Sequence, residues 1–135
     1  MVHQADIFAT IAEILGTTLP EDSGEDSFSF LSLLNGVDKP VRENAVSTSS
    51  RGMPTLRQGA WKLILGTGSG GRSPGSDGEP VQLYNIEKDP GETNNHYRDM
   101  PDRVSEMRSL MEKLISDGRS NPGPKQVNDV VVIRY

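Results

Sequence analysis

The sequence predicts an α+β fold, with a small four-stranded antiparallel sheet, a C-terminal amphipathic helix that packs on it, and an N-terminal helix and loop that precede it. Apolar residues recur with helical spacing near the start of the chain and again over 101–118. Between these segments they alternate in four short runs separated by turn residues. Only 33% of the 135 residues are apolar, so short elements and long loops are expected around a modest core.

The first helix is expected over residues 5–15, with Gly16 as its C-terminal cap. Apolar residues stand at i, i+1, i+4, i+7 and i+8 and form one stripe, which we expect to be the buried face: Ile7, Phe8, Ile11, Ile14 and Leu15. A polar link over 17–27 follows. Residues 29–34 then predict one or two further helical turns.

Alternating runs over 44–49, 53–58, 61–65 and 81–86 predict four antiparallel strands. Gly59 stands at the tight connection between the second and third strands. Six glycines and two prolines over 66–80 predict a mobile loop before the fourth strand, because this segment has too little apolar surface to offset the entropy of ordering.

The last helix is expected to begin at Pro101 and to end at Gly118. Its apolar stripe should cover one face of the sheet: Val104, Met107, Met111, Leu114 and Ile115. Prolines break the tail at 122–124. The β-prone run 130–133 is expected to add a strand to an open sheet edge, the alternative being pairing with a partner chain.

Charge and composition exclude several functions. The net charge is −5 and no basic run is present, which argues against nucleic-acid binding. The absence of cysteine excludes disulfides and thiolate metal sites. No apolar run approaches the length of a membrane span, and no signal segment opens the chain.

The run 66–71 matches the dinucleotide-binding pattern G-x-G-x-x-G and follows a predicted strand. That chemistry needs a helix directly afterwards to hold the pyrophosphate, and the Pro- and Gly-containing continuation 72–78 cannot form one. We therefore interpret the run as a loop.

Other candidate sites have simpler structural interpretations. The acidic residues Glu21, Asp22, Glu25 and Asp26 lack the spacing of a calcium loop and are expected to face water. The two histidines, His3 and His96, are 93 positions apart and form no zinc or acid–base pattern. Ser47, Ser49 and Ser50 lie in no nucleophile motif.

Four residues of the sheet could form a platform for sugar or sulfate: Arg57, Trp61, Lys62 and Tyr84. Strand alternation, however, places Trp61 and Leu63 on one face and Lys62 on the other. Roles in the core and on the sheet surface are therefore the favoured interpretation.

Residues 54–65 read PTLRQGAWKLIL and residues 81–95 read VQLYNIEKDPGETNN. Together with the final helix, they resemble the C-terminal subdomain of the sulfatases, which carries the patterns (I/L)R-x-G-x-(W/Y)-K-(L/Y) and (E/Q)-L-Y-(D/N)-(L/I)-x-x-D-P-x-E-x-x-N. Residues 2–11 and 18–27 also resemble the helix and link that follow the catalytic core of that family. His96 stands where the family pattern usually has leucine, which predicts looser packing of this turn.

The resemblance implies three segments. Residues 1–40 would be a helix and linker that pack on a catalytic domain absent from this chain, 41–120 the C-terminal subdomain, and 121–135 a tail with a possible extra strand. We thus expect the chain to begin inside one domain and to finish with the next. Family motifs for formylglycine, calcium and sulfate binding lie upstream, so we expect no catalytic, cofactor-binding or metal-ligating residues here. Calcium and formylglycine are implied only for the missing domain.

The sequence therefore predicts a non-catalytic C-terminal part of an arylsulfatase-like sulfuric ester hydrolase, serving as scaffold and as part of the substrate-cleft rim. The alternative is a stand-alone module that binds carbohydrate or protein. Expected partners are the catalytic sulfatase domain or a second copy, through exposed apolar surface at helix 5–15 or the 127–135 strand. The resemblance alone implies an exported or periplasmic location.

Overall fold

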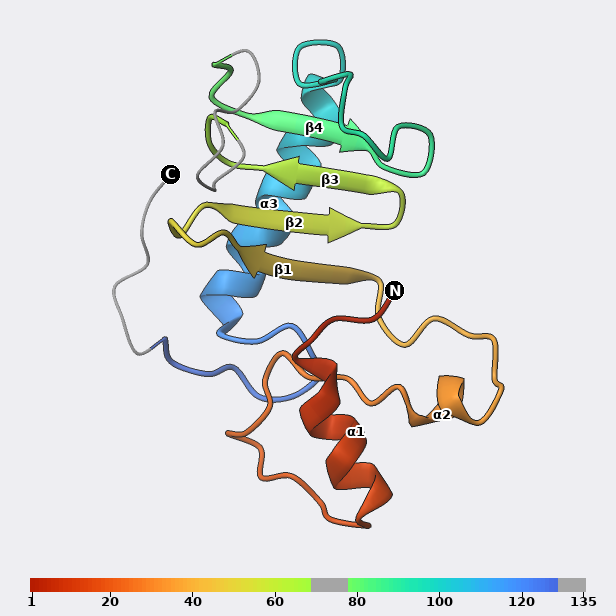
Figure 1. The fold of residues 1–135 in the computed structure, drawn as a ribbon. Helices are drawn as coiled ribbons and strands as arrows, with labels where there is room; N and C mark the ends of the chain where they lie inside the picture. Colours follow the sequence, from red (N-terminus) through yellow and green to blue (C-terminus); the bar gives the residue numbers. More distant parts are fainter. Residues whose placement is uncertain (69–77, 129–135) are drawn as a thin grey trace. The chain divides into compact units, whose positions relative to one another are not determined.

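The computed structural model describes residues 1–68 and 78–128 (Figure 1). The helices and strands, in chain order, are α1 (Asp6–Ile14), α2 (Leu31–Leu34), β1 (Asn44–Thr48), β2 (Pro54–Gln58), β3 (Trp61–Ile64), β4 (Gln82–Asn85) and α3 (Pro101–Asp117). The predicted α+β class is confirmed, and each predicted strand lies within one residue of an observed one at either end.

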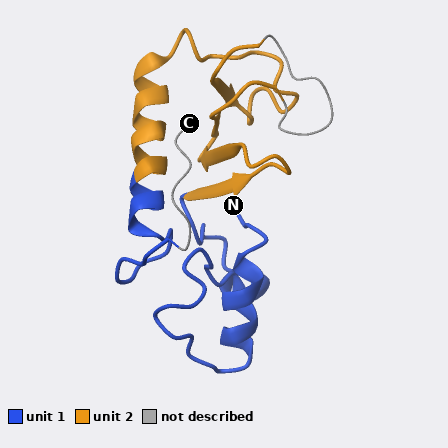
Figure 2. Cartoon of the chain, turned by 90° about the vertical axis from the view of Figure 1, so that its left-hand side faces the viewer, with its two compact units in different colours: residues 1–43, 113–132 blue, residues 44–112, 133–135 orange. Residues whose placement is uncertain are grey.

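The chain divides into two compact units (Figure 2). Among the described residues, unit 1 contains 1–43 and 113–128, and unit 2 contains 44–68 and 78–112. Unit 1 therefore holds α1 and α2, whereas unit 2 holds the whole sheet and most of α3.

Unit 2 is built on an antiparallel sheet with the strand order β1-β2-β3-β4. The register aligns Leu56 with Leu63 and Leu63 with Leu83, and all three side chains are completely buried. The part of α3 in this unit runs along one face of the sheet (Figures 1 and 2) and buries Val104, Met107 and Met111. The predicted role of the final helix as a cover for the sheet is thus confirmed.

The turn between β2 and β3 depends on Gly59, whose φ of 54° lies in the left-handed region that favours glycine. The register pairs Gln58 with Trp61 directly across this turn. The predicted mobile loop over 66–80 lies mostly outside the described residues, as does the predicted strand over 130–133.

The orientation of α1 differs from the prediction. The buried residues of α1 are Asp6, Thr10 and Ala12, whereas the five apolar side chains of the predicted buried stripe are between 48% and 71% exposed. We call these five residues, Ile7, Phe8, Ile11, Ile14 and Leu15, the α1 stripe. The polar face is turned inward because Asp6 and Thr10 satisfy backbone N–H groups of the neighbouring loop.

Candidate functional site

The four residues of the possible sheet platform do not share one face. The register places Arg57, Lys62 and Tyr84 in one row across three strands, and Trp61 precedes Lys62 and so points to the opposite face. Tyr84 is only 2% exposed, and its hydroxyl donates to Gln82 Oε1 at 2.9 Å. A saccharide cannot stack on a ring buried to this extent, and the structural interpretation is favoured.

The charged groups of this row are engaged locally. Lys62 Nζ lies 2.5 Å from Glu92 Oε1 in a half-buried ion pair. Arg57 Nε donates to the carbonyl oxygen of Gly59 at the β2–β3 turn. Both contacts hold turns against the sheet, so these cations serve the fold.

The turn after β4 is organised by Asp89. Its Oδ2 accepts the backbone N–H groups of Thr93 and Asn94, each at 2.8 Å, and its Oδ1 accepts the Thr93 hydroxyl at 3.0 Å. The N–H bond from Asn94, followed by the hydroxyl and N–H bonds from Thr93, lowers the pKa of Asp89 below its usual value. Glu92 adopts a φ of 54°, rare for a residue other than glycine, at the position from which it reaches Lys62.

Asn95 and His96 attach the end of this turn to β4. Asn95 Oδ1 accepts the N–H of Leu83 at 2.9 Å, and the His96 N–H donates to the Leu83 carbonyl at 2.8 Å. The His96 ring meets Trp61 edge-on, with ring centroids 5.7 Å apart. The half-buried imidazole thus has an aromatic neighbour, and the looser packing expected at His96 stays a prediction.

The serine and histidine candidates have structural partners. Ser49 Oγ accepts the backbone N–H groups of Arg51 and Met53, at 3.2 and 3.1 Å, and so closes the turn between β1 and β2. His3 Nδ1 accepts the N–H of Ala5 at 3.4 Å. These contacts give both side chains a structural role, and the interpretation that neither acts as a nucleophile or base stays a prediction.

The first residues of the glycine-rich segment are held by a side chain of β4. Gln82 Nε2 donates to the carbonyl oxygens of Gly66 and Gly68, each at 2.8 Å. The remainder of the G-x-G-x-x-G match lies outside the described residues.

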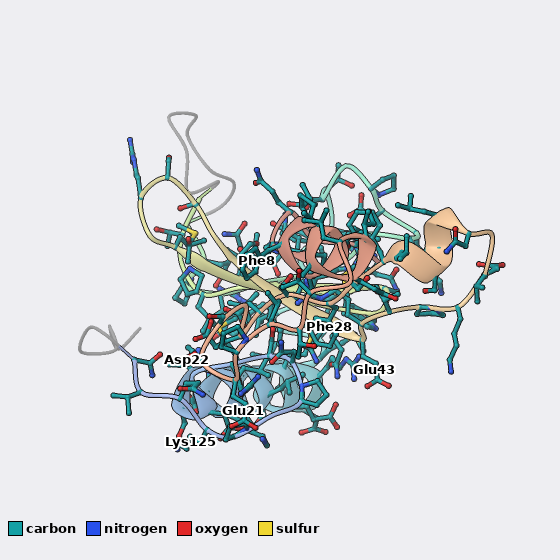
Figure 3. The ribbon with its side chains drawn as sticks, turned by 90° about the horizontal axis from the view of Figure 1, so that it is seen from below. Phe8, Glu21, Asp22, Phe28, Glu43 and Lys125 are labelled. Atoms are coloured by element: carbon teal, nitrogen blue, oxygen red, sulfur yellow. The ribbon has the colours of Figure 1, made fainter. Side chains whose placement is uncertain are left out.

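The acidic loop of unit 1 is held through its backbone. Arg119 donates to the carbonyl oxygen of Glu21 at 3.3 Å, and Asn121 Nδ2 donates to that of Gly24 at 2.8 Å. The side chains of Glu21 and Asp22 remain exposed (Figure 3). Across residues 1–68 and 78–128, no three His, Cys, Asp or Glu side chains gather as a metal ion would require.

The buried face of α1 carries a polar network that local sequence patterns did not predict. Asp6 Oδ1 accepts the N–H of Phe28 at 3.0 Å and lies 2.8 Å from Arg42 Nη1. Thr10 Oγ1 accepts the N–H of Phe30 at 3.1 Å. Because these partners lie 20 to 36 residues away, no motif could have identified them.

The α1 stripe stands on the opposite side of this network. Four of its five residues are at least 50% exposed, including Phe8 (Figure 3), whose ring would lie 3.0 Å from a Cβ added at Gly24. Met1 and Val2, just before the helix, are exposed as well. Exposed apolar surface of this continuity is typical of an interaction site.

Comparisons with known proteins match most of the chain to sulfatases. An N-acetylgalactosamine-6-O-sulfatase of Bacteroides thetaiotaomicron is 34% identical over 120 residues, and the match covers 84% of this chain. A solved structure from the glycosaminoglycan metabolism of the same organism (BT33336S-sulf) is 32% identical with a TM-score of 0.67, over 81% of this chain. The chain corresponds to the C-terminal region of a sulfatase.

A further solved structure, a 2-O GAG sulfatase, shares the fold of this sulfatase region with a TM-score of 0.59 at 22% identity, over 82% of the chain. The chain spans about a quarter of the length of these relatives: 23% of the curated sulfatase and 24% of each solved chain. No family model matches it. None of the helices in the described segments has the length and apolarity of a membrane span.

The sequence contains no cysteine from which the family pattern makes formylglycine. That formylglycine and calcium belong only to the catalytic domain stays a prediction, and we assign no step of sulfate-ester chemistry to these 135 residues.

Proposed function

We propose that this sulfatase region serves as a non-catalytic scaffold, and as part of the substrate-cleft rim, in a sulfuric ester hydrolase. Calcium and formylglycine would then belong to the catalytic part of that enzyme. The observation that carries the proposal is the orientation of α1, which turns its polar face inward and leaves the α1 stripe in water.

The energetics of α1 support this role. Full burial of one large apolar side chain stabilises a protein by about 1.5–3 kcal/mol, so an exposed stripe of five forgoes a substantial stabilisation. A second protein surface that covered the stripe would recover it. The curated relative is about four times longer than the matched region, and its remaining part is a natural source of such a surface.

A chimera tests the scaffold directly. This chain would replace the matching region of the Bacteroides thetaiotaomicron sulfatase, and sulfate release and soluble yield would be measured. Ile11→Glu should lower both, because it places a charge in the proposed interface. Glu13→Gln, at an exposed position of the same helix, is the matched control and should change neither.

The isolated chain provides the complementary experiment. We expect it to release no sulfate from an aryl sulfate in the presence of calcium, because it contributes no nucleophile. Ile11→Glu should leave its thermal unfolding midpoint nearly unchanged, since the side chain is already 50% exposed. Turnover by the isolated chain, or full activity of the Ile11→Glu chimera, would overturn the scaffold proposal.

The second candidate function is a stand-alone binding or interaction module. Its support is a polar hollow in unit 2 rather than the sheet platform. Saccharide binding by a chain that does not engage a sulfatase catalytic domain would favour this alternative.

A further inference from the structure

A surface hollow of about 220 Å³ lies in unit 2, beside the segment that follows the Asp89 turn. Its lining residues are Glu79, Asn95, Tyr97, Arg98 and Asp99. Pockets for drug-sized ligands have volumes of roughly 300–1,000 Å³, so this hollow has room for a single ring.

Asn95 is a structural part of the hollow. Its Oδ1 accepts the N–H groups of Leu83 and Tyr97, at 2.9 and 3.0 Å, and its Nδ2 donates to the Val81 carbonyl at 3.2 Å. These three hydrogen bonds hold Tyr97 and its neighbours beside β4.

Three other lining residues retain capacity for a ligand. The Tyr97 hydroxyl and the Asp99 carboxylate make no hydrogen bond or ion pair with another described residue. Arg98 pairs with Glu79, but its side chain is 77% exposed, and a guanidinium carries five N–H donors. The hollow thus presents a phenol ring, a free carboxylate and free guanidinium donors.

The charge of the hollow decides the class of ligand. Arg98 is neutralised by Glu79, and Asp99 adds a second carboxylate, so the lining has an excess of negative charge. The whole chain is also acidic, with a net charge of −5. A sulfate or carboxylate group would be repelled, whereas a hydroxyl can donate to Asp99 and accept from Arg98.

We propose that this hollow is a subsite for one neutral sugar residue of a glycan. The half-buried Tyr97 ring would face the apolar C–H surface of the sugar, and Asp99 and Arg98 would bind its hydroxyl groups. The choice of a glycan rests on the second candidate function, a binding module, whereas the preference for a neutral residue follows from the charge of the hollow.

NMR titration of the purified chain tests the subsite. N-acetylgalactosamine is the neutral probe and glucuronate the anionic comparison. We expect amide shifts that cluster at Asn95, Tyr97, Arg98 and Asp99, with millimolar affinity for the neutral sugar and weaker binding of glucuronate. A flat response at these amides, or tighter binding of glucuronate, would overturn the proposal.

Substitutions make the test specific. Asp99→Ala removes an exposed carboxylate and should weaken binding of N-acetylgalactosamine about tenfold, as expected for loss of a charge-assisted hydrogen bond. Tyr97→Phe keeps the aromatic ring and should weaken binding of N-acetylgalactosamine less than Asp99→Ala does. Glu112→Ala, an exposed carboxylate on α3, is the control. Equal effects of Asp99→Ala and Glu112→Ala would refute the subsite and leave the scaffold proposal intact, because that proposal depends on α1.

Discussion

The guanidinium of Arg42 lies 2.8 Å from the carboxylate of Asp6, and the two side chains are 2% and 0% exposed. The same carboxylate accepts the N–H groups of His3 and Phe28, at 2.7 and 3.0 Å. Arg42 also lies over the Phe28 ring, 4.7 Å from its centroid. One buried ion pair therefore joins the start of α1, the loop that follows it and the segment before β1.

Arg42→Ala should destabilise the protein by about 3–5 kcal/mol, because it leaves the Asp6 carboxylate buried without its cation. Urea unfolding followed by circular dichroism would measure the loss. Arg51→Ala, at an exposed arginine, should change the free energy of unfolding by less than about 0.5 kcal/mol. Similar results for the two variants would show that the buried pair contributes little.

Two glycines with the same backbone angle should respond differently to alanine. Gly16 and Gly118 have φ values of 66° and 64°, but a Cβ at Gly16 meets nothing within 4 Å, whereas one at Gly118 would lie 2.5 Å from the Gln126 carbonyl oxygen. Gly16→Ala should cost about 1–2 kcal/mol from the left-handed conformation alone. Gly118→Ala should cost clearly more, and thermal unfolding of both variants compares them. A smaller loss for Gly118→Ala would contradict the close approach of Gln126.

Stability should fall in acid partly through Asp89. The pKa of Asp89 is lowered in the folded protein, first by the N–H bond from Asn94. The ionised carboxylate therefore contributes fully to the free energy of unfolding when the pH is above the pKa of the unfolded chain, about 4. This contribution is lost as the pH falls through the lower pKa of the folded protein. Asp89→Asn should lower the unfolding midpoint at neutral pH and flatten its decline below about pH 4.

A pH series of thermal unfolding midpoints would check this effect. The unfolding midpoint of Asp89→Asn should still depend on pH to some extent, because the hydrogen bond from Lys113 also lowers the pKa of Asp117. Asp102→Asn, an exposed carboxylate, serves as the control. An unchanged acid decline in Asp89→Asn would assign the pH dependence to other groups.

The isolated chain should self-associate through the α1 stripe, which is uncovered when no catalytic domain is present. Light scattering should show a molar mass that rises with concentration, and Ile11→Glu should return the chain to the monomer mass of 14.7 kDa. Glu13→Gln should not. A monomer at high concentration without any substitution would exclude this interface between copies.

Much of the fold could be predicted because its signals are local. Alternation placed the strands, and Gly59 marked the turn between β2 and β3. The spacing of Val104, Met107 and Met111 identified the buried face of α3. That prediction succeeded because α3 has an apolar sheet within its own unit to cover.

The same rule failed at α1, although the helix itself was predicted within a residue or two. Periodicity shows that Ile7, Ile11 and Ile14 share a face, but it does not show which surface covers that face. In this structure the opposite face is buried, because Asp6 and Thr10 have long-range polar partners.

Sequence patterns did not predict the hollow either. Tyr97, Arg98 and Asp99 belong to no motif, and Glu79 approaches Arg98 from 19 positions earlier in the chain. The motif residues beside them, Asp89 and Asn95, instead fold the turn. Their hydrogen bonds go largely to the backbone, so Asn95 lines the hollow as a structural residue, and the proposed ligand contacts come from Tyr97, Arg98 and Asp99.

The order and type of the elements, the absence of cysteine chemistry and the likeness to sulfatases could all be read from the chain, because each depends on composition or on neighbours a few residues apart. The inward direction of Asp6, its pairing with Arg42, the exposure of the α1 stripe and the hollow at Tyr97 emerged only from the tertiary structure. Burial and long-range pairing depend on which distant segments of the chain come into contact, and the local spacing of apolar residues carries no information about those contacts.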